Sequence, residues 1–109
     1  MLNTWIEGLS TSDVEFDLPV ELGIVSFLVV NGDSSSHTVT IEEYIPEISN
    51  WVVLYENTLA SKTDDYWQRT FRLPSDHKLR ARTAASTGSY TVRLYINYYD
   101  LRYAEGLIL

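Results

Sequence analysis

Residues 78–99 constrain the fold of this 109-residue chain most, because they contain two alternating stretches joined by a run of small residues. Side chains of a β-strand alternate between its two faces, and both stretches follow this period of two. The small residues 84–89 include a glycine and are typical of a loop. We therefore expect a β-hairpin formed by residues 78–83 and 90–99. In its second arm, one face would carry Tyr90, Val92, Leu94, Ile96 and Tyr98, and the other Thr91, Arg93, Tyr95, Asn97 and Tyr99.

Five other segments are rich in β-forming residues and are bounded by polar stretches, the longest of which is residues 57–65. No segment has the period of an amphipathic helix. This pattern predicts an all-β protein: a single antiparallel β-sandwich of about seven to eight strands, with a jelly-roll or immunoglobulin-like Greek-key arrangement. Its core should include Phe71, Leu94 and Ile96. The five segments are residues 13–18, 22–30, 37–44, 51–55 and 66–73.

The segment Leu22–Val30 is apolar on both of its faces. A sandwich strand normally keeps one face in solvent, so we expect a central strand whose outer face is covered by the first residues of the chain, its last residues or another subunit. We expect residues 1–12 to form an N-terminal arm, residues 13–103 the sandwich and residues 104–109 an apolar C-terminal tail. In one alternative, the first residues fold on their own domain or stay disordered.

The formal charge of −7 argues against a nucleic-acid partner, because phosphates attract basic proteins. No Lys or Arg precedes Lys62, so residues 1–61 carry −10 and the remainder +3. Two interpretations stay open: an average over mixed strands, and two complementary surfaces that favour self-assembly. The absence of cysteine excludes disulfides and thiolate metal sites. With no membrane-length apolar run and no recognisable signal peptide, we expect a protein made in the cytoplasm without a membrane partner.

No constellation of residues indicates catalysis, and we expect neither enzyme activity nor a cofactor. Asp33, Ser34–Ser36 and His37 combine the residue types of a catalytic triad, but neighbours in one turn cannot adopt its geometry. The pairs Glu42-Glu43 and Asp64-Asp65 lack the spacing of a calcium loop, so we interpret them as solvated charge. Two histidines without cysteine do not form the pattern of a zinc site.

Aromatic residues are abundant, with three Trp, three Phe and eight Tyr. Tyr95 and Tyr99 share the outward phase of their strand with Arg93 and Asn97. This combination can pack against protein or stack on a sugar ring. A third interpretation is that tyrosine is simply a good β-former.

Residues 51–98 resemble a recurrent pattern in small virion proteins of tailed phages. In that pattern an aliphatic strand leads to a short decorated segment, then to a turn and strand of the form L-P/A-x-G/D-x-L-x-V/A-R, and then to small-small-G-x-V-x-V-x-I. The chain departs from it at Asp76-His77, where a glycine is commoner, and in its Trp-bearing N-terminal segment. The resemblance implies a non-enzymatic virion component, such as a head decoration or cement protein, a neck part or a fibre module. The corresponding residues are 51–55, 57–59, 73–82 and 87–92, with residues 24–31 and 38–41 also similar.

Together with this resemblance, the surface features predict a structural protein of a virus particle, above all a bacteriophage capsid decoration or cement protein. It would bind capsid or its own copies, reside in the virion after synthesis in the host cytoplasm, and form a homo-oligomer. The alternative is a carbohydrate-binding, lectin-like domain or a receptor-binding fibre module. The residues that we expect at a protein interface are Trp5, Ile6, Arg93, Tyr95, Asn97, Tyr99, Leu107, Ile108 and Leu109.

Overall fold

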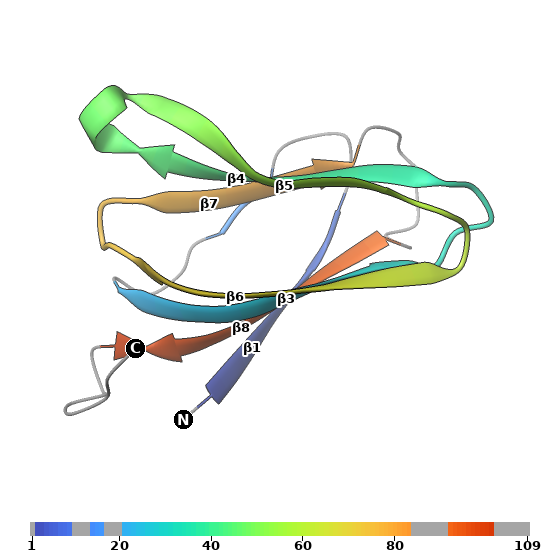
Figure 1. Ribbon diagram of the computed structural model, residues 1–109, viewed down its shortest axis with the longest axis horizontal. Coiled ribbons are helices and arrows are strands. Elements are labelled where there is room, and N and C mark those ends of the chain that lie inside the picture. The colour runs from blue at the N-terminus through green and yellow to red at the C-terminus, as the bar shows by residue number, and fades with distance from the viewer. Residues whose placement is uncertain (1, 10–13, 17–20, 84–91, 102–109) are drawn as a thin grey trace.

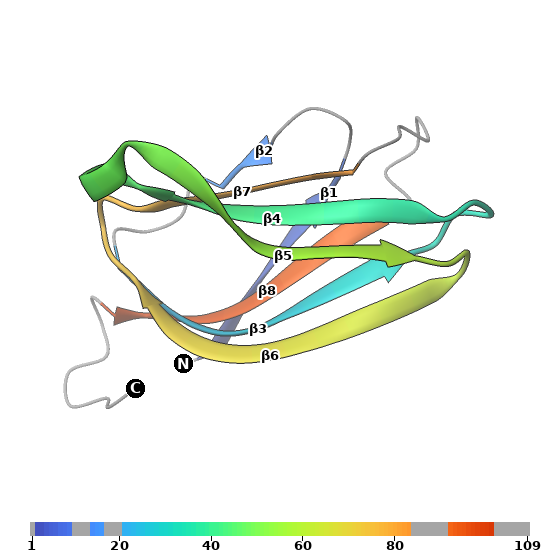
Figure 2. The ribbon, with the colours of Figure 1, turned by 45° about the horizontal axis from the view of Figure 1, so that its top comes forward.

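The computed structural model describes residues 2–9, 14–16, 21–83 and 92–101, which form two four-stranded antiparallel sheets stacked face to face (Figures 1 and 2). The predicted all-β sandwich is therefore confirmed. Sheet A has the strand order β1 (Leu2–Gly8), β8 (Val92–Asp100), β3 (Leu22–Asn31) and β6 (Thr63–Leu73). Sheet B has the order β2 (Val14–Glu15), β7 (Lys78–Thr83), β4 (His37–Ile45) and β5 (Asn50–Leu59), with a short 3-10 helix, η1 (Pro46–Ile48), between β4 and β5.

The core lies between the sheets and consists of the inward-pointing residues of both. Leu94 and Ile96, which we expected there, are fully buried, whereas Phe71 is partly buried and packs against the cluster. Phe27 is the largest fully buried side chain, and the Trp67 ring stacks on it at 5.2 Å between centroids. Burial of apolar surface between two such faces is the main source of stability in a sandwich.

The expected hairpin of residues 78–83 and 90–99 is wrong. β7 pairs with β2 and β4 in sheet B, whereas β8 pairs with β1 and β3 in sheet A. Leu79 of β7 and Leu94 of β8 are both fully buried, so the two strands bring their apolar faces to the same core from opposite sheets. Alternation indicates a strand and its buried face but does not identify the strand with which it pairs. The two alternating segments therefore gave no evidence that they pair with each other. Residues 84–91, which join them, lie outside the described part of the chain.

The first residues of the chain form an edge strand of sheet A. β1 pairs antiparallel with β8, from Leu2 opposite Tyr99 to Gly8 opposite Arg93. Trp5 is partly buried against the core, while Ile6 on the other face is exposed. Residues 2–9 thus fold on their own domain, which is one of the alternatives for residues 1–12. Docking of these residues on a neighbouring subunit stays a prediction.

β3 occupies the central position expected for Leu22–Val30, since it lies between β8 and β6. Its register shifts between Ile24 and Ser26 relative to both neighbours, as at a β-bulge. The shift changes the phase: Ile24 and then Phe27 point into the core, and Leu28 points outward. A strict period of two from Ile24 would have buried Leu28 instead.

Within the part of the chain that the structure describes, no helix has the length and apolar character required to cross a membrane.

Candidate interaction surface

The strands β1, β8, β3 and β6 lie side by side in sheet A (Figure 2), and their register places the side chains that point away from the core in rows across the sheet. In the register of the sheet, Ile6 pairs with Tyr95, Tyr95 with Leu28, and Leu28 with Tyr66. Ile6 and Tyr66, at the two edges, are 55% and 57% exposed. We call these four residues the apolar row, and the whole surface the outer face of sheet A. The other described strands all belong to sheet B, which packs against the opposite face of sheet A through the core.

A polar row lies beside the apolar row and consists of Thr4, Asn97, Ser26 and Gln68. Thr4 Oγ1 donates to Asn97 Oδ1 at 2.7 Å, and Asn97 Nδ2 donates to Ser26 Oγ at 2.9 Å. These hydrogen bonds fix the Asn97 amide across three strands. The polar groups at the middle of the face are therefore largely satisfied within the sheet, which lowers the cost of covering them.

Two further rows complete the outer face of sheet A. Beyond the polar row, Leu2 pairs with Tyr99, Tyr99 with Gly23, and Gly23 with Arg72. On the far side of the apolar row lies a row with two charged residues, which we call the charged row. It consists of Gly8, Arg93, Val30 and Asp64.

The structure brings together five of the residues that we expected at an interface. Ile6, Arg93, Tyr95, Asn97 and Tyr99 all lie on the outer face of sheet A. Trp5 does not join them: it points to the opposite face of β1, packs against the core, and donates from Nε1 to Glu7 Oε1 at 2.7 Å. Leu107, Ile108 and Leu109 lie outside the described residues.

Leu28, Tyr66 and Leu2 are among the residues of this face that the sequence did not predict. Leu28 was missed because only the register shift in β3 places it outward. Tyr66 did have an outward phase in its strand, but nothing local indicated that β6 would lie in the same sheet as β8. Leu2, which is 50% exposed, belongs to a strand whose alternation is obscured by apolar residues on both faces.

The spacing of the two tyrosines bears on the sugar-binding alternative. Tyr95 and Tyr99 are four residues apart on one strand, so their Cα atoms are about 13 Å apart. Two aromatic rings at that distance cannot both stack on a single sugar unit. Their arrangement fits contact with an extended surface better than a single-ring pocket.

The outer face of sheet B carries a compact ion-pair cluster. Glu42 is 7% exposed, and its Oε1 accepts from Arg80 Nε at 3.1 Å and from Arg82. Burial raises the pKa of Glu42, but the hydrogen bonds from the two arginines outweigh it and leave the pKa lower than usual. Our interpretation of the Glu42-Glu43 pair as solvated charge is therefore wrong for both residues: two arginines of β7 contact Glu42, and the Glu43 side chain is 12% exposed and lies 2.6 Å from His77.

An aromatic contact extends this cluster toward the tip of the β4–β5 hairpin. The Arg80 guanidinium lies 3.9 Å from the centre of the Trp51 ring, and Tyr44 packs against Trp51 at 5.3 Å. Cation–π contact of this kind holds the guanidinium flat on the ring. Figure 1 shows that the hairpin with η1 projects beyond the body of the sandwich. Its exposed apolar residues are Ile48, Val52 and Val53.

His77 joins the β6–β7 turn to this hairpin through carboxylates. Its Nδ1 lies 2.6 Å from Glu43 Oε2, and its Nε2 lies 3.4 Å from Glu47 and 3.9 Å from Asp76. The hydrogen bond with Glu43 raises the pKa of His77 against the opposing effect of burial. Glu47, Asp76 and His77 offer ligand atoms within 4.8 Å of one another. An imidazolium paired with carboxylates already explains this geometry, so we assign no metal site here.

The Asp64-Asp65 pair is solvated at one residue only. Asp64 is exposed, whereas Asp65 accepts from Tyr55 Oη at 2.7 Å and from Asn57 Nδ2 at 3.2 Å. Burial, helped by this carboxylate, raises the pKa of Tyr55 to about 12. These contacts tie β5 to β6 at the side where the two sheets meet.

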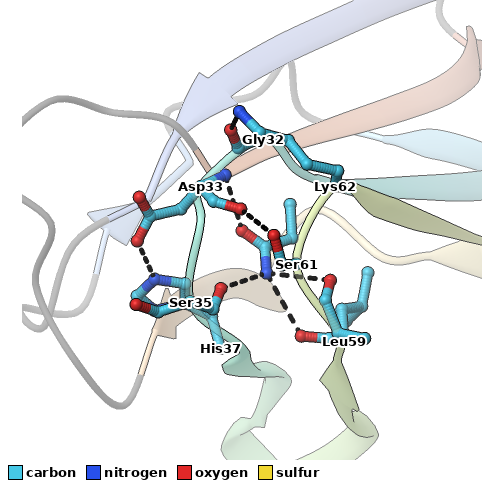
Figure 3. A network of polar contacts seen from close by, with 9 residues as sticks. Gly32, Asp33, Ser35, His37, Leu59, Ser61 and Lys62 are labelled. Carbon is cyan, nitrogen blue, oxygen red and sulfur yellow. Dashed lines mark hydrogen bonds and ion pairs between the residues drawn. The ribbon is translucent and has the colours of Figure 1, made fainter.

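Asp33 and the three serines that follow it form a turn between β3 and β4, as expected, and His37 is the first residue of β4 (Figure 3). His37 Nε2 lies 2.8 Å from Asp33 Oδ2, and this hydrogen bond lowers the pKa of Asp33. The other ring nitrogen, Nδ1, is buried without a hydrogen-bond partner, and the three serines of the turn are exposed. The histidine therefore braces the turn through Asp33 instead of facing a serine hydroxyl.

Asn31 anchors this turn to the neighbouring β5–β6 turn. The side chain is fully buried, and its Nδ2 donates to the carbonyl oxygens of Ser35, Leu59 and Ala60 at 2.9, 3.1 and 3.1 Å. Its Oδ1 accepts from the Asp33 backbone N–H at 3.0 Å. One amide thus satisfies backbone groups from two turns that lie far apart in the sequence.

Comparison with known proteins identifies no family for this chain. No protein-family model matches it, and no curated protein matches its sequence. Among solved structures, a chain in the structure of infectious bursal disease virus Gx strain is similar, with a TM-score of 0.40 and 12% sequence identity. The match covers 89% of this chain and 33% of that one, so the present chain spans about a third of its length. This is a distant likeness of fold alone.

Proposed function

We propose that this protein is a non-enzymatic structural component of a virus particle and that it binds other virion proteins or its own copies through the outer face of sheet A. The apolar row carries the proposal, because it crosses the whole sheet and ends in two side chains that are more than half exposed. Contiguous apolar surface of this kind is costly to leave in water and typically marks a contact with another macromolecule.

More specifically, we propose that the protein is a bacteriophage capsid decoration or cement protein that resides in the virion. It is supported by the resemblance of residues 73–82 and 87–92 to small tailed-phage virion proteins. Both histidines and Glu42, which could have served acid–base catalysis, are engaged in structural contacts: His37 with Asp33, His77 with Glu43, and Glu42 with two arginines. These contacts support a non-enzymatic role.

The proposal is tested on purified particles from the source of this sequence. Mass spectrometry should detect the protein in a fixed copy number relative to the major capsid protein. Tyr95→Ala should reduce its attachment to particles at least tenfold, while Tyr44→Ala, the same change on the outer face of sheet B, should leave attachment unchanged. Absence of the protein from clean particles, or equal attachment of both variants, would contradict the proposal.

The carbohydrate-binding alternative is distinguished by the same variant. If the outer face of sheet A bound sugar, Tyr95→Ala would abolish binding on a glycan array and spare attachment to particles. An array without signal for the unsubstituted protein removes this alternative.

A further inference from the structure

The order of residues in the apolar row is self-complementary. From β1 to β6 it reads aliphatic, aromatic, aliphatic, aromatic: Ile6, Tyr95, Leu28, Tyr66. When a second copy of the row is laid over the first in the reverse order, Ile6 faces Tyr66 and Tyr95 faces Leu28. Every ring then packs on an aliphatic side chain, and no position brings two large rings or two small side chains together.

When the second copy is laid over the first in this way, the neighbouring rows also fit at their central positions, whereas at the edge Leu2 would lie over Arg72, whose guanidinium is ion-paired with Glu21. Tyr99 would lie over Gly23, where no side chain competes for space, and Asn97 would lie over Ser26. In the charged row, Arg93 would lie over Val30, which is paired in its own sheet with Asp64. Each arginine is thus brought beside the aspartate of the other copy, and this happens twice in a symmetric pair.

Charge also favours approach through this face. The chain has a formal charge of −7, so two copies repel one another over most orientations. On the outer face of sheet A, the described charges balance: Arg93 is opposed by Asp64, and Arg72 is ion-paired with Glu21 at 2.7 Å. This neutral, largely apolar face is where two acidic molecules can meet without net repulsion.

We propose that the outer face of sheet A binds the same face of a second copy, in a two-fold dimer whose axis runs parallel to the strands between β8 and β3. The inference rests on the proposed function, since it names the partner of the same surface. The two A sheets would stack about 10 Å apart, as in an aligned sandwich. Four strands and about seven residues per strand give a footprint on the order of 450 Å² per copy. Stable interfaces bury roughly 800 Å² per partner, so the dimer should be weak and dependent on concentration.

Another two-fold arrangement is excluded by the row pattern. An axis in the plane of the sheet but across the strands would reverse the order of the rows. With full overlap, the apolar row would then lie over the polar row of Thr4, Asn97, Ser26 and Gln68. That arrangement would place apolar side chains on amides and hydroxyls, and only the strand-parallel axis keeps like rows together.

Chemical crosslinking tests the geometry, because the chain contains no cysteine of its own. Ile6→Cys and Tyr66→Cys proteins are mixed at high concentration and treated with a short thiol-to-thiol crosslinker. The mixture should give a heterodimer, whereas each variant alone should not, since equal positions lie three strands apart across the axis. A matched mixture of Ile6→Cys with Thr58→Cys, on the outer face of sheet B, should stay monomeric. Crosslinking of Ile6→Cys with Thr4→Cys in place of Tyr66→Cys would overturn the proposed axis, because the axis across the strands lays Ile6 over Thr4.

Sedimentation of the full chain tests the dimer itself. The unsubstituted protein should pass from monomer to dimer as its concentration rises, and Arg93→Glu should weaken the dimer at least tenfold by placing a carboxylate beside Asp64. Adding Asp64→Arg to Arg93→Glu should restore it. A monomer at every concentration overturns the inference. So does a monomer that starts to self-associate when Leu107, Ile108 and Leu109 are replaced by serine, because the chain's own residues would then cover the face.

The two proposals fail in different ways. A protein that is present on particles but monomeric in solution contradicts the dimer and leaves the virion role standing. A dimer with the expected crosslink that is absent from particles contradicts the virion role and leaves the dimer standing.

Discussion

Tyr95 of β8 is the direct register partner of Leu28 of β3, and both side chains point away from the core of the sandwich. The pair stands at the centre of the apolar row. It exists because the register of β3 shifts between Ile24 and Ser26 and turns Leu28 outward. A local backbone irregularity therefore completes the surface to which we assign binding.

Leu94 is fully buried in the core, so Leu94→Ala should lower the free energy of unfolding by about 2–5 kcal/mol. The loss combines the transfer of the removed atoms with the cavity that they leave. Chemical denaturation measures it. Ile48→Ala, which truncates an exposed residue of η1, serves as the control and should change stability by less than about 0.5 kcal/mol. Equal effects of both substitutions would mean that β8 has the opposite phase.

Trp5 and Ile6 test the orientation of β1. Trp5 packs against the core, so Trp5→Ala should cost about 2 kcal/mol or more, whereas Ile6→Ala should cost less than about 0.5 kcal/mol in the monomer. Thermal or chemical unfolding at low protein concentration separates this effect from self-association. If both changes were neutral, residues 1–12 would be an arm that does not contribute to the fold.

Asn31→Asp should destabilise the protein by about 3 kcal/mol or more. The substitution removes the amide donor shared by three carbonyl oxygens and puts a carboxylate into a fully buried position. Asn50→Asp, at an exposed position, provides the matched control. Hydrogen exchange should show that the Asn31 variant opens first at the β3–β4 and β5–β6 turns. Uniform protection in both variants would show that Asn31 does not anchor these turns.

Glu42 should make stability dependent on pH in the acid range. Its pKa is lower in the folded protein than the usual value of 4.5, so its contribution is present above that value and is lost as the pH falls through the lowered pKa. Glu42→Gln should therefore cost about 2 kcal/mol at pH 7 and progressively less below pH 4.5. Denaturation curves across this range measure the difference. Glu56→Gln, on an exposed part of β5, is the control and should change the free energy of unfolding at pH 7 by less than about 0.5 kcal/mol.

Much of the strand content could be predicted from the sequence, since a period of two reflects burial of one face. This alternation predicted strands at residues 22–30, 37–44 and 66–73, and all three segments are strands in the structure. The prediction of a long polar loop at residues 57–65 was wrong, because β5 continues to Leu59 and β6 begins at Thr63. Backbone pairing does not depend on apolar side chains, so polar strand ends left no signal.

Strand neighbours could not be predicted, because partners are chosen by the tertiary structure. Residues 78–83 and 90–99 resembled a hairpin, but each strand found its partners in a different sheet. The same limit applies to the candidate surface. The outward phase of Tyr95 and Tyr99 could be derived locally, whereas the place of Tyr66 in the same face required the order of strands in sheet A.

The pairing of β1 with β8 bears on how the chain reaches this structure during synthesis. Leu2 lies opposite Tyr99, so sheet A joins segments from far apart in the sequence, and closing such long loops makes folding slow. β3 and β6 can pair while β8 is still being made, which leaves one hydrogen-bonding edge of β3 open on the nascent chain. Until residues 92–100 emerge from the ribosome, that open edge can pair with other chains, and a chaperone that covered it during this interval would favour correct folding.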